Sequence, residues 1–182
     1  MSNGNILTPE FRVSFPNVFR PQKPMQQGGE PKYGIVCLFP KDADLKELKK
    51  AAQAVVKEKW GDKPPKNLRS PFRDQGEREY EGYEEGCIFF TATSKQKPGL
   101  VDADVQDIID ETEFYAGCYA RASVRFFTYD VNGNRGVGVG LQNVQKLRDG
   151  EPLGGVRAKP EDDFAPAGAG SDEGDDSENL FG

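Results

Sequence analysis

Short stretches in which apolar and polar residues alternate recur along the chain, a pattern typical of half-buried β-strands. Residues 11–15 alternate in this way and predict a short strand that Pro16 ends or restricts to a sheet edge. The compact apolar runs 33–39 and 87–93 predict two buried strands. The chain is therefore expected to be mainly β.

The longest alternating stretch is 114–129, and a second one follows at 137–144. Asn132 and Gly133 lie between them, and an Asn-Gly pair flanked by alternating runs is a strong hairpin signal. We therefore interpret 130–134, which imitates the opening of a calcium-binding loop, as a hairpin turn. The glycines at alternate positions of the second stretch would let a backbone or a ligand approach closely; they are Gly136, Gly138 and Gly140.

One segment has helical periodicity. Its apolar positions fall on one helical face and are Leu45, Leu48, Ala52, Val55 and Val56. Asp42 or Asp44 can cap the helix, with Glu47 completing a pair like a capping box, and Gly61 is a natural end. About five strands, this helix and a final hairpin predict an OB-fold-like five-stranded barrel.

The composition excludes several classes of catalytic and metal site. The chain contains no histidine, which excludes Ser-His-Asp and Cys-His catalysis and zinc sites that need imidazole. Three widely spaced cysteines do not resemble a disulfide framework, and we expect a reducing cytosol. No apolar run is long enough to span a membrane, and the beginning of the chain lacks the features of a signal peptide.

Charge is distributed unevenly along the chain. All 24 Lys and Arg precede residue 161, and eight of the 30 Asp and Glu follow residue 160, so the body carries a net charge of +2 and the tail −8. Residues 161–182 combine Gly, Ala and acids with few groups to bury, as disordered tails do. We therefore predict a folded domain over 1–160 and a disordered acidic tail over 161–182.

The stretch 114–129 contains the most informative residues. One face is small or apolar, and the chain has no acid anywhere within this stretch. The opposite face carries aromatic and basic residues, which suit stacked bases and a phosphate backbone; its candidates for nucleic-acid binding are Tyr119, Arg121, Arg125, Phe127 and Tyr129. The alternative is that these aromatic residues cover a second core layer.

A long charged loop over 66–86 repeats this composition. Its candidates for nucleic-acid binding are Arg69, Phe72, Arg73, Arg78, Tyr80 and Tyr83. Exposed aromatic residues in a long loop usually need a partner. The alternative is that Phe72 and the tyrosines attach the loop to the barrel, and the glutamates of the loop argue against a purely basic patch.

A cluster of carboxylates offers an enzymatic alternative, because metal-dependent nucleases use closely spaced carboxylates. Its members are Asp102, Asp104, Asp107, Asp110, Glu111 and Glu113. Without an imidazole or an adjacent lysine to activate water, we predict no metal site, no cofactor and no catalytic residue.

Four segments, in this order, resemble the tailed-phage single-stranded-DNA-binding proteins, a family with an OB-fold core that was first catalogued as a domain of unknown function. They are FRVSFPNVFRP, YGIVCLFPK, SPFRDQGEREYEGYEEG and FYAGCYARASVRFFTYDVNGNRGVGVGLQNVQKL. The resemblance implies binding of single-stranded DNA with little sequence preference during phage replication and recombination, in the host cytoplasm.

The acidic tail resembles those by which such proteins recruit replication or recombination partners, and the resemblance implies partner contacts at Asp175, Asp176, Leu180 and Phe181. Gly182 follows the last aromatic residue, whereas such tails more often end on it. An accessory factor that binds a replication enzyme instead of DNA is the alternative function. A homo-oligomer is compatible with the sequence.

Overall fold

The computed structural model describes residues 5–22, 30–80 and 82–153. Its elements, in chain order, are β1 (Ile6–Leu7), β2 (Phe11–Gln22), β3 (Lys32–Leu38), α1 (Lys46–Trp60), β4 (Arg73–Asp74), the 3-10 turn η1 (Gln75–Glu77), β5 (Ile88–Ser94), β6 (Gly99–Val101), the 3-10 turn η2 (Glu111–Glu113), β7 (Tyr119–Val131) and β8 (Asn134–Arg148). The described part of the chain is therefore mainly β with one α-helix, as predicted.

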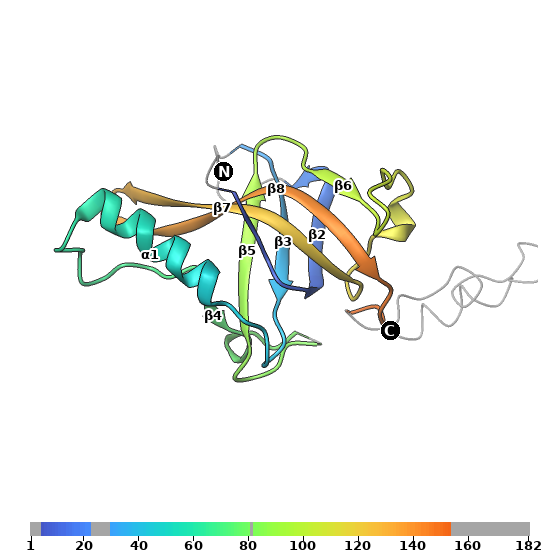
Figure 1. Cartoon of the computed structure of the whole chain (residues 1–182), viewed down its shortest axis with the longest axis horizontal. Coiled ribbons are helices and arrows are strands. Elements are labelled where there is room, and N and C mark those ends of the chain that lie inside the picture. The colour runs from blue at the N-terminus through green and yellow to red at the C-terminus, as the bar shows by residue number, and fades with distance from the viewer. Residues whose placement is uncertain (1–4, 23–29, 81, 154–182) are drawn as a thin grey trace, which may run out of the picture.

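Five strands form a closed ring of hydrogen bonds in the order β2, β3, β5, β8, β7 and back to β2 (Figure 1). All neighbours in the ring are antiparallel except β5 and β8, which run parallel, with Ala92 opposite Val139. This ring is that of a five-stranded OB-like barrel and confirms the predicted fold class. The short strands β1, β4 and β6 add to its margins.

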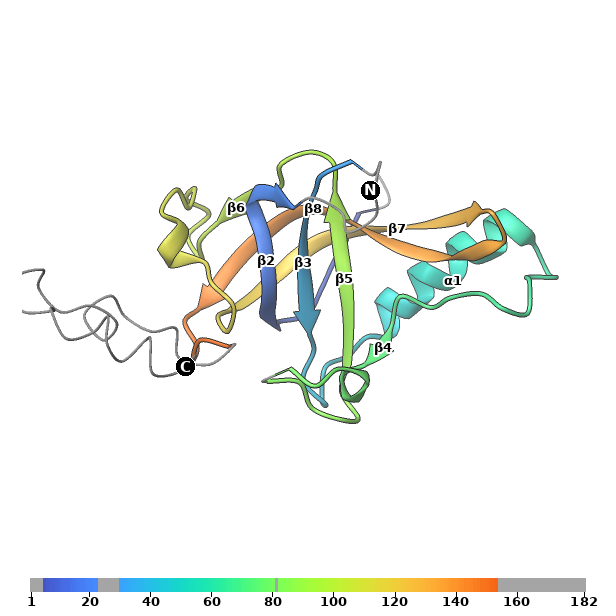
Figure 2. The same ribbon diagram turned by 180° about the vertical axis from the view of Figure 1, so that it is seen from behind.

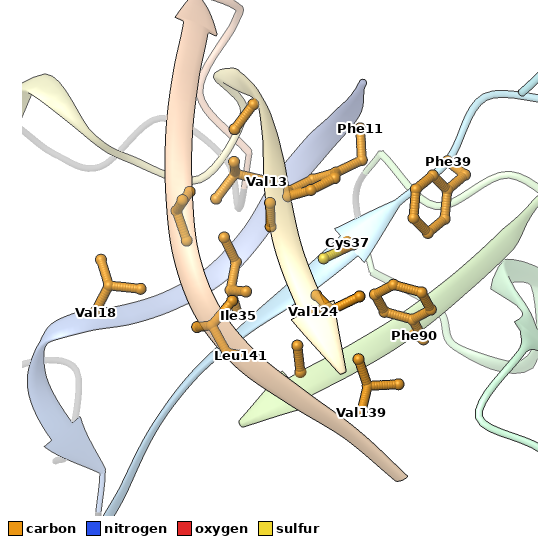
Figure 3. Close-up of a cluster of buried hydrophobic side chains, with 14 of the residues drawn as sticks. Phe11, Val13, Val18, Ile35, Cys37, Phe39, Phe90, Val124, Val139 and Leu141 are labelled. Atoms are coloured by element: carbon orange, nitrogen blue, oxygen red, sulfur yellow. The ribbon is translucent and has the colours of Figure 1, made fainter. Parts of the chain in front are cut away.

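The core fills the inside of the ring (Figure 3). Alternate residues of each strand point inward, and in β7 these are Ala120, Ala122, Val124 and Phe126. The ring of Phe39 makes edge contacts with Phe90, at a centroid distance of 5.0 Å, and with Phe11, at 5.8 Å. The small and apolar face of the predicted long strand is thus the core face.

Helix α1 follows β3 and packs against β7 and β8 (Figure 2). It buries Leu48 and Ala52, as its apolar face predicts. The side chain of Asp44 accepts a hydrogen bond from the backbone N–H of Lys46 at 3.1 Å. The helix begins at Lys46, one residue later than an N-cap at Asp44 would place it. Gly61 ends the helix with a φ of 66°.

Several predicted strand boundaries were wrong, and β8 extends beyond the predicted 137–144 at both ends. Strand β2 does not end at Pro16, because a register shift between Ser14 and Asn17 places the proline where the ladder with β3 is already interrupted. Pro16 also lies beyond the ladder with β7, which involves only Phe11 and Arg12, so the alternative of a sheet edge agrees with the structure. At this bulge Phe15 has a φ of 44°. Strand β7 begins at Tyr119 instead of Phe114, because the chain turns at Gly117, whose φ is 114°.

The predicted hairpin joins β7 and β8 through Asn132 and Gly133, with φ values of 51° and 84°. Positive φ at both positions is the geometry that an Asn-Gly pair favours. The long loop is held to the barrel by the buried side chain of Gln75, whose Nε2 donates to the carbonyl oxygens of Phe39 and Ile88. The loop is therefore seated on the barrel.

In the described segments, no helix has the length and apolarity needed to cross a membrane. The three cysteines are buried free thiols at Cys37, Cys87 and Cys118. The predicted acidic tail and its partner residues, including Leu180 and Phe181, lie outside the described residues.

Candidate nucleic-acid interface

The outer surface of the β7–β8 hairpin pairs large side chains with glycines. Arg125 lies opposite Gly140, Phe127 opposite Gly138 and Tyr129 opposite Gly136. We call these six residues the hairpin face. Because the β8 partners have no side chains, the Phe127 ring lies across the backbone of Gly138, where a β-carbon would collide with it. Phe127 nevertheless keeps 45% of its surface exposed.

The hairpin face continues across the barrel through small residues. Gly140 is opposite Thr93 on β5, and Thr93 is opposite Gly34 on β3. The row therefore crosses four strands, from Arg125 on β7 to Gly34 on β3. Between these two residues, Thr93 has the one side chain of the row. A backbone or a flat ring can approach such a surface closely.

The long loop brings Arg69 to this surface. The backbone N–H of Arg69 donates to the carbonyl oxygen of Arg135, and the carbonyl oxygen of Arg69 accepts from the N–H of Val137. Its guanidinium donates to Oδ1 of Asn134 at 3.3 Å. Arg69 thus borders Gly136, so one predicted loop residue joins the residues of the hairpin face.

Arg78 and Tyr83 lie over the outer faces of β2, β3 and β5. The Tyr83 hydroxyl is 2.9 Å from Oγ of Ser14, and the Arg78 guanidinium is 5.0 Å from the centre of the Phe89 ring. Burial raises the pKa of Tyr83, although the hydrogen bond with Ser14 opposes the shift. These contacts agree with the alternative interpretation, in which Tyr83 attaches the loop to the barrel.

Two other loop candidates lie apart from the hairpin face. Phe72 packs inward against Phe90 and Phe126, with centroid distances of 5.9 and 5.8 Å. Its ring anchors the loop to the core. Arg73 forms an exposed ion pair with Glu77 at 2.8 Å.

Tyr119 and Arg121 lie at the beginning of β7, separated from Arg125 by a register shift between Ser123 and Val124. The guanidinium of Arg148 stacks on the Tyr119 ring at 3.9 Å, and that of Arg12 is at 5.9 Å. Arg121 donates to Oε1 of Gln145 at 2.7 Å. These side chains form a second basic and aromatic group on the barrel.

Phe15 is an exposed aromatic residue that the sequence analysis did not identify as a site residue. Alternation would put Phe15 on the same face as the buried Phe11 and Val13, but the bulge turns it outward, and 48% of its surface is exposed. Its ring makes an edge contact with Tyr80, itself 50% exposed, at 5.0 Å. The signal available in the sequence is Pro16, which is compatible with a strand only at an edge or a bulge.

The carboxylates of 102–113 build turns. Oδ1 of Asp102 accepts from the N–H groups of Asp104 and Gln106. The hydroxyl and N–H of Thr112 donate to Asp110 and lower the pKa of that carboxyl. Across the residues placed by the structure, no three Cys, Asp or Glu side chains are grouped to hold a metal ion.

Comparison with known proteins gives relatives in sequence and in structure. Protein p50 of Acyrthosiphon pisum secondary endosymbiont phage 1 is 34% identical, covering 86% of this chain and 91% of that protein. The single-stranded DNA-binding protein of bacteriophage Enc34 in complex with ssDNA has a TM-score of 0.72 at 22% identity, over 84% of this chain and 91% of that chain.

A third similar structure is gp2.5, a single-stranded DNA-binding protein encoded by bacteriophage T7. Its TM-score is 0.60 at 14% identity, covering 87% of this chain and all of that chain (100%). These structural similarities support the OB-like fold. The family model described as Enterobacter phage Enc34, ssDNA-binding protein, matches residues 4–179. The chain therefore belongs to the Enc34 family of phage ssDNA-binding proteins, a non-enzymatic family, as the resemblance predicted.

Proposed function

We propose that this protein binds single-stranded DNA with little sequence preference through the hairpin face. The observation that carries the proposal is the pairing of Phe127 and Tyr129 with glycines, which leaves the Phe127 ring 45% exposed and brings Tyr129 and Arg69 together at Gly136. Bases stack on such rings, and arginines contact the phosphates between them. Membership of an ssDNA-binding family supports the same function.

Stacking explains the low sequence preference. Every base has an aromatic face, so a site that uses Phe127 and Tyr129 accepts any of the four. The row of Gly140, Thr93 and Gly34 carries few groups that could recognise base edges. Selection of single strands follows because bases in a duplex are already stacked and paired.

The other candidate residues lie outside the hairpin face, and we propose that they contact the DNA beyond it. Tyr80 offers an exposed ring beside Phe15, and Arg78 lies over Phe89. Tyr119 and Arg121 belong to the second basic and aromatic group with Arg12 and Arg148. We expect this second group to contribute phosphate contacts and less stacking than Phe127, because the Tyr119 ring already carries the guanidinium of Arg148.

In the phage life cycle we expect the protein to protect single strands during replication and recombination, in the host cytoplasm. The acidic residues of the tail, including Asp175 and Asp176, would recruit replication or recombination proteins together with Leu180 and Phe181. The alternative of a metal-dependent nuclease is not supported, because the family is non-enzymatic.

The experiment that tests the proposal is a mobility-shift assay with labelled oligonucleotides of several sequences, with and without magnesium. We expect a shift for every sequence, no cleavage, and a weakened shift for Phe127→Ala combined with Tyr129→Ala. Absence of a shift in the folded protein would favour the accessory factor that binds a replication enzyme. Cleavage that depends on magnesium would favour a nuclease.

A further inference from the structure

An open groove lies between α1 and the segment that follows it. It has a volume of about 630 Å³, and its apolar walls include Val56, Leu68, Phe72, Ile88 and Val137. Lys49 and Lys57 line its helix side. The groove is large enough to receive more than one aliphatic side chain.

The chain around this groove is strongly basic. Residues 46–69 contain eight Lys and Arg against three Asp and Glu. The lysines of α1 are exposed, including Lys49, Lys50 and Lys57. A ligand for this groove therefore combines apolar side chains with negative charge.

The segment after β6 combines exposed apolar side chains with negative charge. Residues 102–113, which we call the acidic loop, contain six Asp and Glu and no Lys or Arg. Ile109 is 85% exposed and Val105 is 67% exposed, the two most exposed large hydrophobic residues of the described chain. Hydrogen bonds from the N–H groups of Asp104 and Gln106 to Asp102 hold the turn that presents Val105.

The groove and the acidic loop lie at opposite ends of the long axis of the molecule. Helix α1 is at one end, and the loop that follows β6 is at the other, in both views (Figures 1 and 2). Both are attached to one closed barrel, so the acidic loop of a chain does not reach the groove of the same chain. Their complementarity can be satisfied only between two copies.

We propose that the acidic loop of one copy docks into the helix groove of the next, with Val105 and Ile109 in the groove and the carboxylates beside the lysines of α1. A contact between two different surfaces of the same chain leaves a free groove at one end of each pair and a free loop at the other. The assembly is therefore an open row that can grow.

This row would connect self-association with DNA binding. Arg69 lines the groove and also borders the hairpin face, so a docked neighbour lies beside the proposed DNA path. Neighbours that contact each other on one strand bind it cooperatively. The docking itself does not depend on the proposed function, because it can be measured without DNA.

Two variants of the full chain test the docking. A loop variant carries Val105→Asp and Ile109→Asp, and a groove variant carries Lys49→Glu and Lys57→Glu; all four side chains are exposed, so the fold should persist. Leu7→Asp, a change at a 56% exposed position outside both surfaces, is the matched control. Analytical ultracentrifugation in low salt measures the mass as a function of concentration.

We expect the mass of the parent and of Leu7→Asp to rise steadily with concentration, and each variant alone to remain monomeric. An equimolar mixture of the two variants should form a dimer and nothing larger, because one intact groove and one intact loop remain. A monomeric parent, or a mixture without dimer, would overturn the proposal. A chain without residues 154–182 that no longer associates would also overturn it, because the tail would then be the occupant.

Discussion

The ring of Phe127 rests on the backbone of Gly138, its cross-strand partner on β8. An alanine at position 138 would place a β-carbon too close to Cζ of the Phe127 ring, whereas one at Gly140 would meet its nearest atom, the carbonyl oxygen of Arg125, at 3.4 Å, an ordinary contact. The absence of a side chain at position 138 therefore fixes where the exposed ring lies.

Gly138→Ala should weaken ssDNA binding several-fold, because the Phe127 ring must leave its position over the backbone of residue 138. Fluorescence titration with an oligonucleotide measures the affinity, and thermal unfolding checks the fold. Gly140→Ala is the matched control and should bind like the parent. Equal losses in both variants would mean that the position of Phe127 does not determine affinity.

Phe127→Ala and Arg125→Ala should differ in their salt dependence. Loss of the ring should cost about 1–3 kcal/mol of binding free energy with an almost unchanged salt slope. Loss of the arginine should make the slope of log K against log salt shallower by about 0.7, the contribution of one phosphate contact on a single strand. Titrations at four or more salt concentrations separate the two effects. Parallel slopes for both variants would contradict these assignments.

The described part of the chain ends close to the proposed DNA path. Leu153, the last residue described, packs against Val36, Leu38 and Phe89 and contacts Gly82. A polyanion attached there competes with DNA at a high effective concentration. Removal of 161–182 should therefore tighten ssDNA binding several-fold in dilute buffer, with a smaller gain at 0.1 M salt, where screening acts over about 10 Å.

The same salt series with full-length protein is the comparison for the tail. Equal affinities of the two chains at every salt concentration would exclude competition by the tail. In that case the acidic residues would serve solubility or partner binding alone.

Acid should destabilise the protein below about pH 4. Hydrogen bonds from the N–H groups of Gly76 and Gly86 lower the pKa of Asp74, and Lys146 and Tyr115 lower that of Asp149. In the unfolded chain the pKa of both carboxyls is about 3.9. Between their lower pKa in the folded protein and this value, the unfolded chain binds more protons than the folded protein, so the free energy of unfolding rises with pH. Melting temperatures from pH 2.5 to 7 should therefore fall on the acid side and level off above about pH 5. The Asp74→Asn variant should show a smaller acid-dependent loss; an unchanged loss would contradict this role of Asp74.

Affinity for ssDNA should be nearly constant between pH 6 and 8. The chain has no histidine, and burial raises the pKa values of Cys87 and Tyr83, which moves their titration further above this window. Titrations at constant ionic strength check this expectation. A steep change with the fold intact would indicate a perturbed group at the interface.

Much of the fold could be predicted because its signals are local. The Asn132-Gly133 hairpin and the end of α1 at Gly61 both depend on residues that favour positive φ. The extent of β2 could not be predicted, because it depends on the ladder with β3, which resumes beyond the bulge with Asn17 opposite Gly34. The bulge at Phe15 accommodates Pro16, so the rule that proline ends a strand did not apply.

The arrangement of the candidate residues could be predicted in part. Alternation along β7 predicted that Arg125, Phe127 and Tyr129 share the face opposite the core, because the side-chain period of a strand is local. The packing of Phe72 against Phe90 and the stacking of Arg148 on Tyr119 are contacts between distant segments. Composition cannot distinguish an aromatic residue that anchors a loop from one that remains free.

The closed ring also determines when the protein can fold during synthesis. Ile6 pairs with Val124 and Phe11 with Ala120, so the first strands have no partner in β7 until most of the chain has been made. Such non-local pairing slows folding relative to helical proteins of similar size. We expect the β7–β8 hairpin to form early and the parallel β5–β8 pair to close the ring afterwards. Until the ribosome has released β8, the apolar faces of β2 and β3 stay uncovered, and the nascent chain is most vulnerable to aggregation during this interval.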